Sequence, residues 1–272
     1  MDIYKCSSEE FKKNCKIPLR VMETENDMYE EIAQIMLDTI KAKNGEKTLI
    51  ICPVGPINQY PIFAEKVNRE CVSLKNVWFI NMDAYLDDDD NYISYDSILS
   101  FRAIMDNLCY SRIDPDLVMP KSQRLFPVPG KEEQADRLIE EMGADLCLTG
   151  VGINGHIAFN EPPEADDKIS DAEFENISTR CLNISRETVT NNGANKICGA
   201  LDVFPKRCIT LGMKQLLSVK KFKVYLYCPW QWGIMRKIGL TDADKSAPAS
   251  FLQHHPDAEM VVSRELFEKK VF

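Results

Sequence analysis

Short apolar runs alternate with longer segments of helical periodicity along most of the chain. Buried strands are predicted at residues 48–52, 77–80, 146–149, 208–211, 222–228 and 259–262. Helices are predicted at residues 28–43, 62–71, 93–108 and 132–142. This alternation is typical of an α/β fold, a doubly wound (Rossmann-like), mostly parallel sheet with helices on both faces.

Length and composition favour one large domain over residues 1–272. The chain has 272 residues, of which 44% are hydrophobic and 28% charged, so it can bury one sizeable core. Its net charge of -9 disfavours a nucleic-acid partner. No apolar run approaches the roughly 18 residues of a membrane span, and the polar start argues against a signal peptide. We therefore expect a cytoplasmic protein with no membrane partner.

Neither the cysteines nor the acidic run predicts a metal site. The ten cysteines include no C-x-x-C pair and no histidine at zinc-like spacing, so they are expected to be mostly small core residues in a reducing compartment. The acidic run 87–90 could hold a divalent cation, but a solvated loop is the favoured interpretation because four successive carboxylates cannot all converge on one ion.

Segments that carry glycine, histidine or carboxylate residues follow three of the predicted strands. The strand at 146–149 leads into a glycine-rich turn that carries His156 and Glu161; Asp83 follows the strand at 77–80, and Gly55 follows the strand at 48–52. The carboxyl ends of parallel strands meet at one edge of the sheet, where such folds bind ligands. A histidine with a carboxylate that orients it, and a second, separate carboxylate, suit proton transfer along a sugar carbon chain. No nucleophile is indicated.

The glycine-rich turn also matches a dinucleotide fingerprint. Gly150, Gly152 and Gly155 have the G-x-G-x-x-G spacing and follow a strand. That fingerprint normally opens the first βαβ unit of its domain, whereas at least two strands precede this one, and two prolines at 162 and 163 interrupt any helix that would begin here. A nicotinamide or flavin cofactor is therefore not expected.

Two segments carry a resemblance to a known family. The sequence from Gly150 to Pro162 (GVGINGHIAFNEP) and the sequence from Phe79 to Tyr85 (FINMDAY) resemble the glucosamine-6-phosphate deaminase (isomerase) family, which shares its fold with the 6-phosphogluconolactonases. The resemblance extends over most of the chain. It implies conversion of an amino-sugar phosphate to a ketose phosphate and ammonia without a cofactor, in a protein that is often a homo-oligomer.

The resemblance also implies roles for individual residues. Asp83 is similar to the base that moves the C2 proton to C1, His156 to the group that assists ring opening, and Glu161 to its orienting partner, while Asn154 stands where the family has aspartate in the same turn. The resemblance also implies substrate-binding positions, some of them in segments that replace the family's binding segments. These positions are Gly55, Asn58, Gly152, Gly155, Arg180, Gln231 and Trp232.

The segments that correspond to the family's phosphate site depart from its pattern together. The loop 53–58 (PVGPIN) has a proline and an isoleucine in place of a glycine and a threonine, the expected arginine falls within 191–193 (NNG), and the expected lysine falls within 229–232 (PWQW). We therefore expect a substrate that lacks the terminal phosphate or carries it elsewhere. Arg180, Arg186, Lys196 and Lys214 are candidates for a relocated anion site, and Trp230 and Trp232 could stack on a sugar or pack in the core.

Three classes of function stay open at this point. The first is a sugar or sugar-phosphate isomerase or deaminase acting through Asp83, His156 and Glu161. The second is a catalytically silent sugar-binding or regulatory protein, which Asn154 and the altered phosphate segments favour. The third is a lactonase-type hydrolase, which is disfavoured because the residues after His156 follow the deaminase pattern.

Overall fold

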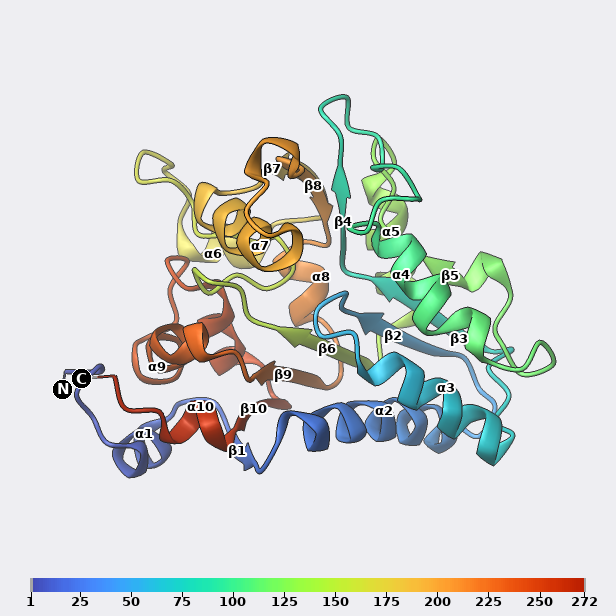
Figure 1. Cartoon of the computed structure of the whole chain (residues 1–272), viewed down its shortest axis with the longest axis horizontal. Coiled ribbons are helices and arrows are strands. Elements are labelled where there is room, and N and C mark those ends of the chain that lie inside the picture. Colours follow the sequence, from blue (N-terminus) through green and yellow to red (C-terminus); the bar gives the residue numbers. More distant parts are fainter. Residues whose placement is uncertain (1, 272) are drawn as a thin grey trace.

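The computed structural model describes residues 2–271, and its larger sheet has seven strands (Figure 1). Their order is β1-β10-β9-β6-β2-β3-β5, and every neighbouring pair is parallel. The strands are β1 (Leu19–Met22), β2 (Thr48–Cys52), β3 (Val77–Asn81), β5 (Arg124–Leu125), β6 (Leu146–Gly150), β9 (Phe222–Leu226) and β10 (Ala258–Ser263). The predicted α/β fold with a mostly parallel sheet is confirmed.

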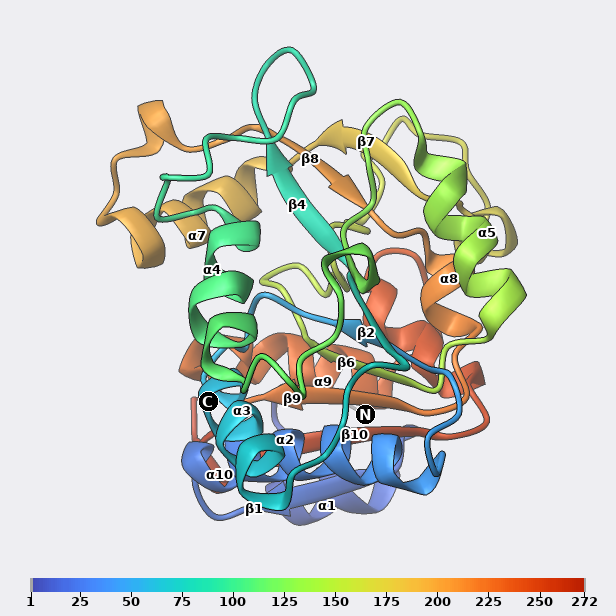
Figure 2. The same ribbon diagram turned by 90° about the vertical axis from the view of Figure 1, so that its right-hand side faces the viewer.

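A second, antiparallel sheet was not anticipated. It has the order β4-β8-β7, with β4 at Asp83–Leu86, β7 at Arg180–Asn183 and β8 at Arg207–Thr210. Figure 2 shows this sheet above the larger one, joined to it by the chain that leaves β3 and enters β4. The strand predicted at 208–211 therefore exists, but it belongs to this antiparallel sheet rather than to the parallel one.

Helices pack against both faces of the larger sheet. They are α1 (Ser8–Asn14), α2 (Glu25–Ala42), α3 (Gln59–Glu70), α4 (Phe101–Leu108), α5 (Glu132–Met142), α6 (Asp171–Glu175), α7 (Arg186–Ile197), α8 (Met213–Leu217), α9 (Trp232–Leu240) and α10 (Arg264–Glu268). The alternation along β2 shows how the faces are divided: Ile50 and Cys52 pack in one apolar cluster with α2 and α3, whereas Leu49 and Ile51 pack in a second cluster with α8 and α9. Both faces of the strand are therefore buried, as a doubly covered parallel sheet requires.

One helix prediction was wrong over half of its length. The apolar residues of segment 93–108 suggested a continuous helix, but α4 begins only at Phe101, with Ser100 as its N-cap. The preceding residues form turns, in which the Ser94 hydroxyl accepts a hydrogen bond from the Asp96 N–H and the Ser97 hydroxyl accepts one from the Leu99 N–H. Serine side chains that bond nearby backbone groups compete with helix formation in this way.

Within residues 2–271, no helix has both the length and the apolar character needed to cross a membrane. All ten cysteines are free thiols. Half of them, rather than the expected majority, are buried in the core, namely Cys6, Cys52, Cys109, Cys147 and Cys208, whereas Cys71 and Cys198 are exposed.

Candidate active site

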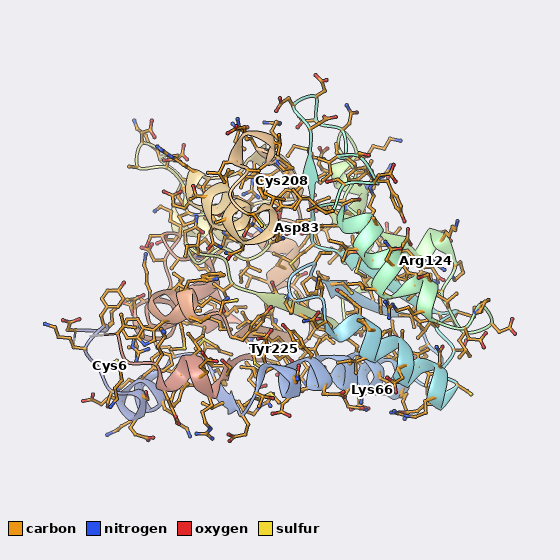
Figure 3. All side chains as sticks on the ribbon, in the orientation of Figure 1. Cys6, Lys66, Asp83, Arg124, Cys208 and Tyr225 are labelled. Atoms are coloured by element: carbon orange, nitrogen blue, oxygen red, sulfur yellow. The ribbon has the colours of Figure 1, made fainter. Side chains whose placement is uncertain are left out.

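A cavity of about 390 Å³ opens where the carboxyl ends of β2, β3, β6 and β9 meet. Among the predicted site residues it is lined by Gly55, Asp83, Gly152, His156 and Gln231. Figure 3 places Asp83 near the centre of the molecule, between the antiparallel sheet and Tyr225 of β9. The fold thus brings together segments that are far apart in the sequence, at the edge where parallel sheets bind ligands.

Asp83 is a buried carboxylate at the point where the chain passes from one sheet to the other. It begins β4 two residues after β3 ends, and it pairs with Thr210 of β8. Burial raises the pKa of Asp83 to about 7, against the opposing effect of the Lys196 ammonium. A carboxyl group with this pKa can accept and return a proton near neutral pH.

The His156 ring lies directly against Gly152. A Cβ placed on Gly152 would be 2.0 Å from both Cε1 and Nε2 of His156, so only glycine allows the ring to occupy this position. The turn between them is closed by hydrogen bonds from the Gly152 N–H to the His156 carbonyl and from the Gly155 N–H to the Gly152 carbonyl, both at 3.0 Å. Gly155 has a φ of +89°, which favours glycine there.

The neighbours of His156 assign its tautomer. The Nδ1 atom lies 2.8 Å from Asn154 Oδ1, 3.4 Å from Thr188 Oγ1 and 3.5 Å from Glu161 Oε1. Asn154 donates its amide N–H to Ser185 Oγ at 3.3 Å, which fixes its oxygen toward the histidine. Nδ1 therefore carries the proton and donates it to Asn154, and Nε2 is left as the acceptor beside Gly152.

Glu161 binds the beginning of α7 more closely than it binds His156. One carboxylate oxygen accepts a hydrogen bond from the Ser185 hydroxyl at 2.8 Å, and the other accepts one from the Ser185 N–H at 2.5 Å. Ser185 is also the N-cap of α7, where its hydroxyl accepts from the Thr188 N–H. The buried carboxylate thus joins the histidine turn to the helix that forms one wall of the cavity.

Comparisons with known proteins find relatives by sequence and by fold, although no family model matches the chain. The glucosamine-6-phosphate deaminase of Mycoplasmopsis pulmonis is 24% identical over 88% of this chain and 90% of its own. That of Clostridium perfringens strain 13 is 27% identical over 91% and 98%. The chain is therefore similar over most of its length to glucosamine-6-phosphate deaminases.

Solved structures agree in fold. A deaminase described as monomeric superposes with a TM-score of 0.78 at 23% identity, over 92% of this chain and 98% of that one. The 6-phosphogluconolactonase of Thermotoga maritima superposes with a TM-score of 0.64 at 17% identity, over 91% and 99%. Since the first of these is described as a monomer, the homo-oligomer implied by the deaminase resemblance stays a prediction.

Helix α7 supplies one wall of the cavity, which consists of side-chain amides and one cation. Asn191, Asn192, Asn195 and Lys196 line the cavity, and Asn192 donates a hydrogen bond to the Tyr85 hydroxyl at 3.2 Å. Lys196 is exposed as a whole residue, but its ammonium lies 5.6 Å from the ring centre of Tyr85 and 5.2 Å from that of Phe101. Desolvation lowers the pKa of Lys196, and Asp83 opposes that shift. Of the four basic residues considered for a relocated anion site, only Lys196 lines the cavity.

The other predicted binding residues do not line this cavity. Arg180 donates a hydrogen bond to Asn160 Oδ1 at 2.8 Å, and Trp232 is buried and donates its indole N–H to the Lys269 carbonyl at 2.7 Å. Asn58 precedes α3, and the Gly155 carbonyl accepts from the Ala249 N–H at 2.8 Å. Trp230, the other tryptophan of the same segment, does line the cavity. Ser185 and Thr188 were not singled out in advance, although Ser-x-x-Thr before a polar helix is a recognisable N-cap pattern.

Replacing Asn154 by aspartate is expected to raise the pKa of His156 by about one unit, because a carboxylate would accept the Nδ1 proton and stabilise the imidazolium. At present burial lowers the pKa of His156, and Glu161 opposes the shift. The change is measured by NMR titration of the imidazole protons, which distinguishes His156 from the two other histidines. Asn107→Asp at an exposed position is the matched control. An unchanged titration in Asn154→Asp would contradict the assigned hydrogen bond.

Proposed function

We propose that this chain is an aldose–ketose isomerase that acts on a sugar or amino sugar, with release of ammonia when the C2 substituent is an amine. The proposal rests on one observation above all: Asp83 and His156 are both buried and both line the same cavity. It is supported by the relatives at 24–27% identity that are named as glucosamine-6-phosphate deaminases.

Asp83 is assigned the role of the base. In its ionised form it takes the proton from C2 of the open-chain aldose and returns it to C1, while a proton passes from the C2 substituent to O1, so the carbonyl moves from C1 to C2. For a 2-amino sugar the same transfer gives an imine at C2, and water then adds to it and ammonia leaves, so that the products are a ketose and ammonia. The chemistry requires no electron acceptor and is matched to a carboxyl pKa of about 7.

His156 is assigned to ring opening. Its Nε2 atom is the free acceptor, because Nδ1 donates to Asn154, and a neutral imidazole can take the proton of the anomeric hydroxyl and deliver one to the ring oxygen. Glu161 and Ser185 act as positioning residues, since they fix the turn and helix α7 that hold the ring in place. We further infer that residues 1–272 are one domain, because segments of both sheets line the same cavity.

The proposed activity is tested by incubating the purified chain with glucosamine 6-phosphate, free glucosamine and neutral aldoses. Ketose formation and ammonia release are measured separately. Ketose from at least one aldose, with stoichiometric ammonia from an amino sugar, is the expected result. Sugar binding without any turnover would show a silent binding protein, and acid release from a sugar lactone alone would show a lactonase.

A further inference from the structure

The two ends of the cavity differ in charge. The strand ends that line it follow the sheet order β3, β2, β6 and β9, so Asp83 and the segment after β9 are separated by three inter-strand spacings, about 14 Å. We call the segment formed by Tyr227, Cys228, Trp230 and Gln231 the remote end. The carbon chain of a hexose is shorter than this separation, so a sugar with C1 and C2 at Asp83 extends part of the way and meets the side chains that line the cavity from the remote end.

Charge is concentrated at the Asp83 end. Among the described residues that line the cavity, the single lysine or arginine is Lys196 and the single acidic residue is Asp83. Lys196 lies over the ring of Tyr85, two residues from Asp83, and each of the two groups favours the charged form of the other. The one cation is therefore balanced by the catalytic carboxylate and leaves no surplus positive charge for an anionic ligand.

The remote end contributes neutral groups, and the amide of Gln231 is already committed to hydrogen bonds within the protein. Gln231 accepts hydrogen bonds from the Tyr227 and Cys228 N–H groups and donates one to the Val151 carbonyl, each at 2.8 Å. Its amide therefore holds two loops together instead of offering a charge. Trp230 is half-buried and presents an aromatic surface, which suits the C–H face of a sugar.

The loop after β2 contains two prolines and therefore has fewer backbone donors than its length allows. Pro53 and Pro56 have no N–H group, and Val54, which is buried, directs an apolar side chain to the cavity. A phosphate is usually held by several convergent N–H groups or by cationic side chains. A dianionic phosphate at the remote end would lose part of its hydration without gaining a cationic side chain there, since none of the described residues of that segment that line the cavity is a lysine or an arginine.

We propose that the remote end selects an uncharged terminal hydroxymethyl group, so that the substrate class is unphosphorylated aldoses or 2-amino aldoses. This inference rests on the proposed function for the orientation of the sugar, with C1 and C2 at Asp83. Trp230 is its specificity-determining residue, through stacking on the carbon chain.

The test compares the dissociation constants of glucosamine and glucosamine 6-phosphate, measured by calorimetry on the Asp83→Asn chain so that turnover does not interfere. At least tenfold tighter binding of glucosamine is expected. Equal or tighter binding of the phosphate ester, or no binding of glucosamine, overturns the inference. If the wild-type chain binds glucosamine but forms no product, the proposed function is overturned and the inference about the remote end is not.

Two variants at one position supply the matched pair. Trp230→Lys adds a cation at the remote end and is expected to improve the affinity for the phosphate ester at least tenfold relative to Trp230→Leu, which removes the ring without adding charge. Circular dichroism establishes that both variants are folded. Equal phosphate-ester affinities in the two folded variants would show that the remote end does not face the sugar terminus and would overturn the inference.

Discussion

Replacing Asp83 by asparagine is expected to lower kcat by about a thousandfold while leaving sugar affinity within a few-fold of the wild type. The asparagine side chain has nearly the same shape but cannot take the C2 proton, and positioned general bases typically contribute factors of about 10² to 10⁴. Since Asp83 is buried, loss of its charge also removes the cost of keeping a carboxylate in this site, so the folded state is expected to be retained. Steady-state ketose formation measures kcat, and calorimetry measures affinity.

The pH profile gives this prediction a second measurement. Asp83 acts only in its ionised form, and burial raises its pKa to about 7, so kcat in the wild type should fall as the pH falls through about 7. The residual activity of Asp83→Asn should lack that acid limb. Asp89→Asn, at an exposed position in the nearby acidic loop, is the control and should behave like the wild type. Full activity in Asp83→Asn would remove Asp83 from the mechanism.

The strands that the sequence predicts best are those buried on both faces. Segment 48–52 is Thr48 followed by four apolar residues, and β2 has the same bounds, because a central parallel strand is buried on both faces and leaves little room for polar side chains. The antiparallel sheet gave no comparable signal. β4 is buried throughout and follows β3 after a single residue, so the local sequence does not separate the two strands. β7 is half-exposed. The residue at which a chain changes sheet depends on long-range pairing and is not visible in local periodicity.

The candidate site shows a similar division. Asp83, His156 and Gly152 could be predicted to meet because each follows a parallel strand of one sheet, and the structure places all three at the cavity. Lys196 could not be separated from surface lysines in advance, because its position depends on where α7 packs against Tyr85 and Phe101. Trp230 lines the cavity and Trp232 packs in the core because of the turn that begins α9. Sequence spacing alone does not determine the geometry of that turn.

Replacing Gly152 by alanine is expected to lower kcat by at least about a hundredfold. The new Cβ would lie 2.0 Å from Cε1 and Nε2 of His156 and 2.5 Å from Cδ2, so the ring must leave its place. It cannot move without breaking the 2.8 Å contact between Nδ1 and Asn154, or disturbing the bonds that close the turn. A displacement of about 1 Å at a catalytic group can cost a factor of about 10² in rate. The measurements are kcat and the NMR chemical shifts of the His156 imidazole.

Gly233→Ala is the matched control for this substitution. Gly233 lies in helix α9, and a Cβ there would meet only Tyr4, at an ordinary contact distance of 3.8 Å. Alanine favours the helix over glycine by about 1 kcal/mol, so the control should be as active as the wild type and equally or more stable to denaturant. A Gly152→Ala chain that keeps wild-type kcat would show that the imidazole is free to act from another position, and the role assigned to His156 in ring opening would then be wrong.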